Sequence, residues 1–124
     1  MRALQSALET SNSILELIKA GKLTEINANF VAEKSKSQLT EKNLNKVFSE
    51  AYKNIGKIKN YTKMQWGFLL KQIEGQNYLY SVKIVEHEKA SMNYFFTFDG
   101  GGDYKKLVGL SIRIRKGVRS AGSF

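Results

Sequence analysis

The spacing of apolar residues changes once along the chain, at Gly56, and this change constrains the fold more than any other feature. Before Gly56 apolar residues recur at three- and four-residue steps, as in an amphipathic helix, and after it they recur at every second residue, as in a strand. A chain of 124 residues can build one core but not separate cofactor and substrate domains. We therefore predict a single domain, residues 1–124, with a helical part (1–56), an antiparallel sheet (57–116) and a flexible basic tail (117–124).

Three helices are expected in the first part. The first covers residues 4–20 and ends at Gly21, because glycine tolerates the positive φ that often closes a helix. A short second helix covers residues 24–32. Thr40 is suited to cap a third helix, since its hydroxyl can accept a hydrogen bond from a free N–H of the first turn, and Gly56 ends that helix.

Four strands are expected in the second part, joined by connections short enough for hairpins. Their apolar residues fall within residues 58–70, 78–84, 92–98 and 108–114. The helices must cover the apolar face of this sheet. The predicted fold class is α+β: N-terminal helices packed on a curved antiparallel meander sheet, with a cone-shaped hollow between helices and sheet.

Even-numbered positions of the predicted strands hold the larger apolar residues, so these positions are expected to face the helices. Several are aromatic and could line a pocket, although aromatic residues on an inward face more often form the core. The pocket candidates are Trp66, Phe68, Tyr80, Tyr94 and Phe96.

Odd-numbered positions of the same strands make a basic outer face with apolar residues among the charges. The formal net charge is +9, and residues 57–124 carry most of it, with twelve basic and five acidic side chains. Exposed apolar residues on an open sheet commonly mark an interface. The outer-face contact candidates are Lys59, Tyr61, Lys63, Leu69, Leu79, Lys83, Phe95, Arg113 and Arg115.

The order and spacing of the elements carry a family resemblance. Its landmarks are the first helix, the Gly21-Lys22-Leu23 turn, Leu39-Thr40 before the third helix, the Ile55-Gly56-Lys57 junction and the closing strand at residues 106–112. Together they resemble bacterial nuclear-transport-factor-2-like domains of unknown function, in the cystatin-like superfamily. The resemblance implies a cone-shaped fold, but such domains serve as enzymes resembling ketosteroid isomerases, as ligand-binding cones and as assembly modules of envelopes and secretion systems. It also implies an exported bacterial protein whose leader has been removed, with a cytoplasmic location as the alternative.

Several chemistries are excluded by composition. The chain has no cysteine and a single histidine, so thiolate and His-rich metal sites are excluded, and we expect neither a metal nor a cofactor. No apolar run approaches the ~20 residues of a membrane-spanning helix, so we expect no membrane insertion. The Asp99-Gly-Gly-Gly-Asp103 segment lacks the following helix of a phosphate loop and the regular oxygen ligands of a calcium loop, which favours a flexible hairpin turn.

An acid/base site has few candidates. His87 lies between Glu86 and Glu88 and is expected at a solvated strand end. The two glutamates are the only acids at even strand positions, so an isomerase-like site would need one of them buried near Tyr80 or Tyr94.

The predicted function is a non-enzymatic binding or assembly module. The outer face would contact a protein partner or form a homodimer through Leu69, Leu79 and Phe95, and the hollow would hold a small apolar ligand. A pocket enzyme resembling ketosteroid isomerases is the alternative. Binding of nucleic acid or another polyanion through the basic face ranks third, because a strongly basic domain attracts any polyanion.

Overall fold

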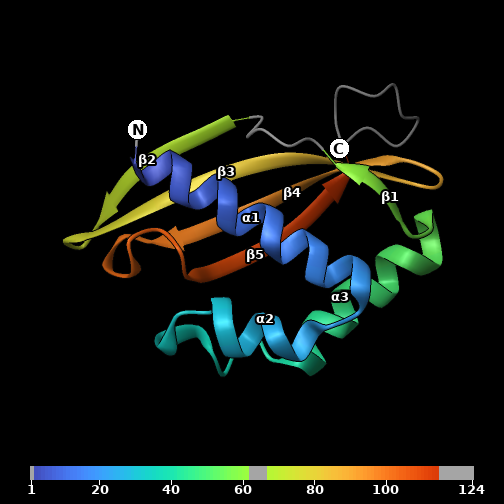
Figure 1. Cartoon of the computed structure of the whole chain (residues 1–124), viewed down its shortest axis with the longest axis horizontal. Helices are drawn as coiled ribbons and strands as arrows, with labels where there is room; N and C mark the ends of the chain where they lie inside the picture. Colours follow the sequence, from blue (N-terminus) through green and yellow to red (C-terminus); the bar gives the residue numbers. More distant parts are fainter. Residues whose placement is uncertain (1, 62–66, 115–124) are drawn as a thin grey trace.

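Three helices pack against a five-stranded antiparallel sheet in the computed structural model, which describes residues 2–61 and 67–114 (Figure 1). The predicted α+β class is confirmed. The helices are α1 (Arg2–Ala20), α2 (Leu23–Phe30) and α3 (Glu41–Ile55), with the short 3₁₀ helix η1 (Glu33–Ser35) before α3. The strands are β1 (Ile58–Tyr61), β2 (Gly67–Ile73), β3 (Gln76–His87), β4 (Ser91–Asp99) and β5 (Leu107–Ile114), with the 3₁₀ helix η2 (Gly100–Gly102) before β5.

The helix boundaries follow local sequence signals. The Thr40 hydroxyl accepts a hydrogen bond from the Asn43 N–H at 3.2 Å, which caps the first turn of α3. Gly21 and Gly56 end α1 and α3 with φ of 75° and 87°, values that favour glycine. The predicted caps and stop residues are confirmed.

The sheet has one strand more than expected. Residues 58–70 were predicted to form one strand, but β1 and β2 are separate strands that both pair with the long β3. Tyr61 of β1 pairs with Val85 near one end of β3, while β2 pairs with residues 76–82 near the other end. Strands β2 to β5 form the expected meander. Strand β1 departs from it because β3, with 12 residues, is long enough for two strands to pair with the same edge.

The inward-facing residues also differ from the prediction on β3. Two-residue turns join β2 to β3 and β3 to β4, so Ile73 pairs with Gln76 and the N–H of His87 donates to the Ala90 carbonyl at 2.8 Å. Paired residues share a face, so each such turn exchanges odd and even positions between its strands. The even positions are buried on β4, as predicted, but the odd positions are buried on β3.

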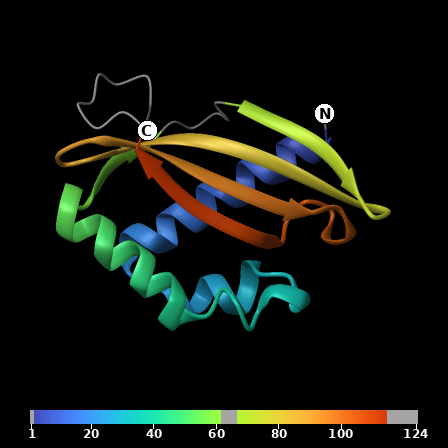
Figure 2. The same cartoon turned by 180° about the vertical axis from the view of Figure 1, so that it is seen from behind.

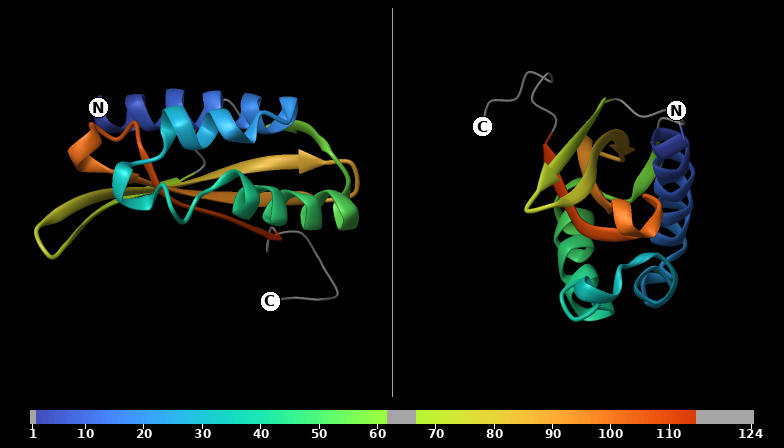
Figure 3. Two further views of the ribbon diagram at one scale, coloured as in Figure 1. Left: turned by 90° about the horizontal axis from the view of Figure 1, so that it is seen from below. Right: turned by 90° about the vertical axis from the view of Figure 1, so that its left-hand side faces the viewer.

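The sheet curls around the helical layer. Seen from behind, the strands lie in front of α1, and α2 and α3 lie on the side of β5 (Figure 2). End on, the strands lie between α1 and α3 (Figure 3, right), and seen from below the β2–β3 hairpin extends beyond the ends of the helices (Figure 3, left). The fully buried side chains of the core come from the helices and from β3, β4 and β5; the largest are Tyr94, Lys83, Phe96, Phe98, Ile14, Leu15, Ile26, Leu79 and Leu107.

Candidate functional site

Exposed apolar side chains are concentrated on one strand. Among the large apolar residues of the described ranges, five have exposed side chains. They are Val47 (42%), Phe68 (51%), Leu69 (58%), Leu70 (44%) and Ile73 (40%). Four of the five lie on β2, so this strand carries most of the exposed large apolar side chains of the described residues.

The position of β2 explains this exposure. It is an edge strand that pairs on one side with residues 76–82 of β3, and the tip of the β2–β3 hairpin extends beyond the helices (Figure 3). Phe68 and Leu70 share a face with the inward residues of β3, and Leu69 shares the opposite face with Tyr80. Both faces of β2 are therefore apolar and accessible, whereas the rest of the sheet is covered on its inner face.

Only part of the predicted outer face is on the surface. Lys59, Leu69 and Arg113 are exposed, and Phe95 is half-buried on the outer face opposite Val82. The predictions for three further residues are wrong, because the register turns them inward: Tyr61 is 8% exposed, and Leu79 and Lys83 are fully buried. Lys63 and Arg115 lie outside the described residues.

The described pocket candidates do not gather around one cavity. Tyr94 and Phe96 are fully buried core residues of β4. Tyr80 is half-buried on the outer face, so the prediction that it faces the hollow is wrong. Phe68 shares the face of the inward residues of β3, as predicted, but its side chain is 51% exposed. Trp66 lies outside the described residues.

His87 is buried rather than solvated, which corrects the prediction. Its Nδ1 lies 2.7 Å from the Gly56 carbonyl oxygen and its Nε2 lies 2.8 Å from the Tyr94 hydroxyl. A carbonyl can only accept, so Nδ1 carries the proton and Nε2 accepts from Tyr94. Burial lowers the pKa of His87 and raises that of Tyr94. The pair joins the end of α3 to the sheet as neutral, hydrogen-bonded core groups.

Glu86 and Glu88 do not provide the carboxylate that an isomerase-like site needs. Both are exposed. Glu86 pairs with Asn60 on the outer face, and the Oε1 atom of Glu88 accepts a hydrogen bond from the Lys57 N–H at 3.1 Å. The two acids on which the enzyme alternative depended are thus outside the helix–sheet interior.

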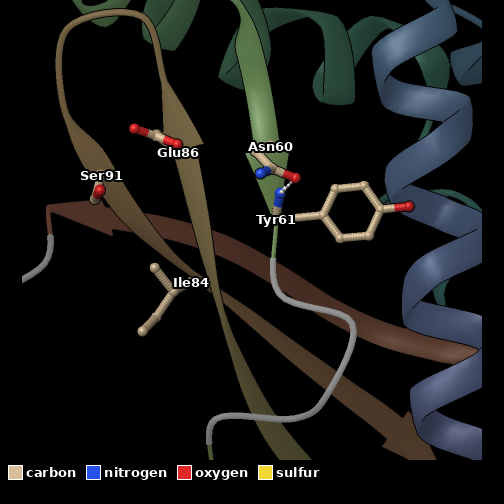
Figure 4. Close-up of a pocket in the computed structure, with 5 residues that line it drawn as sticks. All are labelled: Asn60, Tyr61, Ile84, Glu86 and Ser91. Carbon is tan, nitrogen blue, oxygen red and sulfur yellow. Dashed lines mark hydrogen bonds between the residues drawn. The ribbon is translucent and has the colours of Figure 1, made fainter.

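A depression of about 370 Å³ lies where β1 ends against β3 (Figure 4). Its lining residues are Asn60, Tyr61, Ile84, Glu86 and Ser91. The Tyr61 ring points toward α1 and away from Glu86, and its hydroxyl donates to Glu16. Burial and this hydrogen bond raise the pKa of Tyr61 to about 12, so its hydroxyl stays protonated at neutral pH. The depression therefore offers Glu86, Asn60 and Ser91 as polar groups on an open surface.

A groove of about 450 Å³ lies between α3 and the inner face of β4 and β5. Its lining residues are Lys46, Val47, Glu50, Ala51, Asn54, Ile55, Met92 and Ile112. Most of the exposed lining is apolar, with polar side chains contributed by α3. None of the predicted pocket residues that the structure describes lines this groove.

The glycine-rich segment forms a turn whose polar groups are used locally. Asp99 accepts a hydrogen bond from the Gly101 N–H at 3.0 Å and lies 3.5 Å from the Lys34 ammonium. In the described ranges, no group of three or more His, Cys, Asp or Glu side chains could hold a metal ion. No helix among the described residues is long and apolar enough to cross a membrane.

Comparison with family models, with curated proteins and with solved structures finds no match to this chain. The exposed β2 strand and the groove beside α3 are therefore the features that point to a function.

Proposed function

We propose that this protein is a non-enzymatic binding or assembly module that contacts other protein chains through its sheet, chiefly through β2. The observation that carries the proposal is the concentration of exposed apolar side chains on this strand: Phe68, Leu69, Leu70 and Ile73. Exposed apolar residues are common singly, but a contiguous group of them marks an interaction site. We also propose the relation to nuclear-transport-factor-2-like domains, which the helices-then-sheet order supports.

Photo-crosslinking tests this proposal directly. A photoreactive amino acid placed at Leu69 is expected to form a discrete covalent adduct with a protein in cells that naturally produce the chain. The matched control places it at Lys42, which is exposed on α3. A discrete adduct at position 69 alone supports the proposal, and absence of any adduct specific to position 69 contradicts it.

A second candidate function is binding of a small apolar ligand in the groove beside α3. The apolar lining from Ala51, Ile55, Met92 and Ile112 favours a ligand without charge. Native mass spectrometry of the purified protein is expected to reveal a co-purifying mass. Ala51→Trp fills the groove and should abolish it, whereas Ala28→Trp, on the exposed surface of α2, should not. Purified protein with no added mass would contradict this candidate.

A further inference from the structure

Within the described residues, the outer edge of β2 has little of the usual protection of an edge strand. All seven residues of β2 pair regularly with β3, from Gly67 with Val82 to Ile73 with Gln76. Within the described ranges, no strand pairs with its other edge. Natural proteins block such edges with charges, proline, bulges or a covering segment. The strand has one charged residue, Lys71, and the chain has no proline.

The opposite edge of the sheet, formed by β5, is protected at its beginning. Val31 forms a parallel bridge with Leu107, and the Ala32 N–H donates to the Leu107 carbonyl at 2.9 Å. The pairing of β5 with β4 also contains a register shift at Thr97/Phe98. The segment after α2 thus covers the beginning of β5, and among the described edge strands β2 carries the exposed large apolar side chains.

We propose that β2 pairs edge to edge with β2 of a second copy of this chain, antiparallel about a two-fold axis at Leu70. This proposal deepens the proposed function and rests on it. Centring the pairing on Leu70 uses all seven residues of the strand and keeps inward-facing residues of both copies on the same side. The two sheets then join into one continuous sheet.

The register follows from the side chains that it places opposite one another. Leu70 lies opposite Leu70 of the second copy, Phe68 opposite Gln72, and Leu69 opposite Lys71, whose methylene groups can cover the leucine. Centring the pairing on Lys71 would place two ammonium groups directly opposite each other, which is destabilising. The Leu70 register avoids that repulsion.

A second copy fits this edge better than a charged peptide. An acidic partner would find a single cation on β2, whereas a second β2 strand offers apolar side chains on both faces. The four exposed side chains are divided between the two faces of one short strand, so edge-to-edge pairing buries little apolar surface per copy. This is less than the ~800 Å² per partner of a standard stable interface, so the dimer should be weak and reversible.

The net charge gives this dimer a distinctive salt dependence. Each copy carries a formal charge of +9, so two copies repel each other at low ionic strength. Salt screens the repulsion and leaves the apolar contact intact. Self-association should therefore tighten as salt is raised, whereas binding of the basic surface to a polyanion weakens.

Sedimentation velocity over a concentration series in low and high salt tests the association. We expect a monomer–dimer equilibrium that shifts toward dimer in high salt. Leu70→Lys, which places two charges at the two-fold axis, should weaken dimerisation at least tenfold. Val47→Lys alters the exposed apolar residue of α3 and should leave dimerisation unchanged. Circular dichroism checks that both variants fold.

Engineered cysteines test the register, since the natural chain has none. In the proposed register the two copies of residue 70 lie directly opposite, about 4.5–5.5 Å apart between Cα atoms, a distance that a disulfide spans. The two copies of residue 73 are six residues apart along the strand, about 20 Å. Leu70→Cys should therefore form a disulfide dimer under mild oxidation, and Ile73→Cys should not.

The outcomes separate this inference from the proposed function. A wild-type monomer at every concentration and salt level overturns the edge pairing, as does equal crosslinking of the two cysteine variants. If the chain is monomeric but a photoreactive group at Leu69 captures a different protein, the contact function stands and the self-pairing fails. If neither a dimer nor an adduct forms, both fail.

Discussion

The two ends of β3 lie in contrasting environments. At the end near the β3–β4 turn, the inward side chains of Val85, His87 and even Lys83 are fully or almost fully buried. At the end near the β2–β3 turn, Gln76 and the apolar residues of the paired β2 are exposed. The difference does not follow hydrophobicity, since a lysine is buried and leucines are exposed. Burial depends instead on whether a helix lies over that part of the sheet, and the tip of the β2–β3 hairpin extends beyond the helices (Figure 3).

The largest expected effect comes from truncating a phenylalanine in each environment. Phe96→Ala removes a fully buried ring and should lower the free energy of unfolding by about 3–5 kcal/mol. Phe68→Ala removes a ring that is 51% exposed and should cost less than about 1 kcal/mol. Urea unfolding of both variants measures the contrast. Similar losses for the two would mean that the β2 end is as well packed as the core.

A second pair of variants compares a glycine near each end of β3. Gly56 and Gly75 both have positive φ, 87° and 82°. A Cβ atom at Gly56 would lie 2.7 Å from the Glu88 Cβ, whereas a Cβ at Gly75 meets nothing within 4 Å. We expect about 2–3 kcal/mol of destabilisation for Gly56→Ala and about 1 kcal/mol for Gly75→Ala. Thermal or urea unfolding checks this order, and a larger loss at Gly75 would contradict it.

The His87–Tyr94 hydrogen bond should contribute less to the free energy of unfolding than the losses expected for Phe96→Ala and Gly56→Ala. Tyr94→Phe keeps the ring but removes the hydroxyl that donates to the His87 Nε2 atom, leaving a buried acceptor unpaired. The expected cost is about 1–2 kcal/mol. Tyr80→Phe, at a half-buried position on the outer face, is the matched control and should change stability by less than about 0.5 kcal/mol. Equal effects of the two variants would show that the buried hydrogen bond adds nothing.

The elements that could be predicted from the sequence depend on local signals. Thr40 caps α3 and Gly56 ends it through contacts within a few residues, and the change of apolar period at Gly56 separates helices from sheet. The number of strands could not be obtained in this way. One apolar pattern over residues 58–70 does not reveal that β1 and β2 pair with different parts of β3.

The wrong assignments on β3 have one physical cause. Glu74 and Gly75 both have positive φ and form a two-residue turn of the I′ kind, and such a turn exchanges odd and even positions between paired strands. A Glu-Gly pair between two apolar runs was a usable signal for this exchange. Applying it would have placed Leu79 and Lys83 inside and Tyr80 outside.

His87 could not be placed from its neighbours. Glu86 and Glu88 suggest solvent, and both are exposed. The burial of His87 depends on Gly56 and Tyr94, which are distant in sequence or on another strand. Long-range contacts of this kind lie beyond any pattern of spacing along one strand.

The smallest expected effect is the dependence of stability on pH through His87. Burial lowers the pKa of this imidazole below its ordinary value near 6.5. As the pH falls below about 6.5, the unfolded chain therefore binds a proton that the folded protein does not, and the free energy of unfolding decreases. The slope from one such group is at most about 1.4 kcal/mol per pH unit, and the loss ends once the pH falls below the folded pKa. Above about pH 7 the residue contributes no pH dependence.

Urea unfolding at pH values from about 7.5 to 5.5 measures this slope, and His87→Gln, which cannot titrate, should reduce it. A variant with the same slope as the natural protein would exclude His87 as its source and would weaken the contrast between the buried and exposed ends of β3.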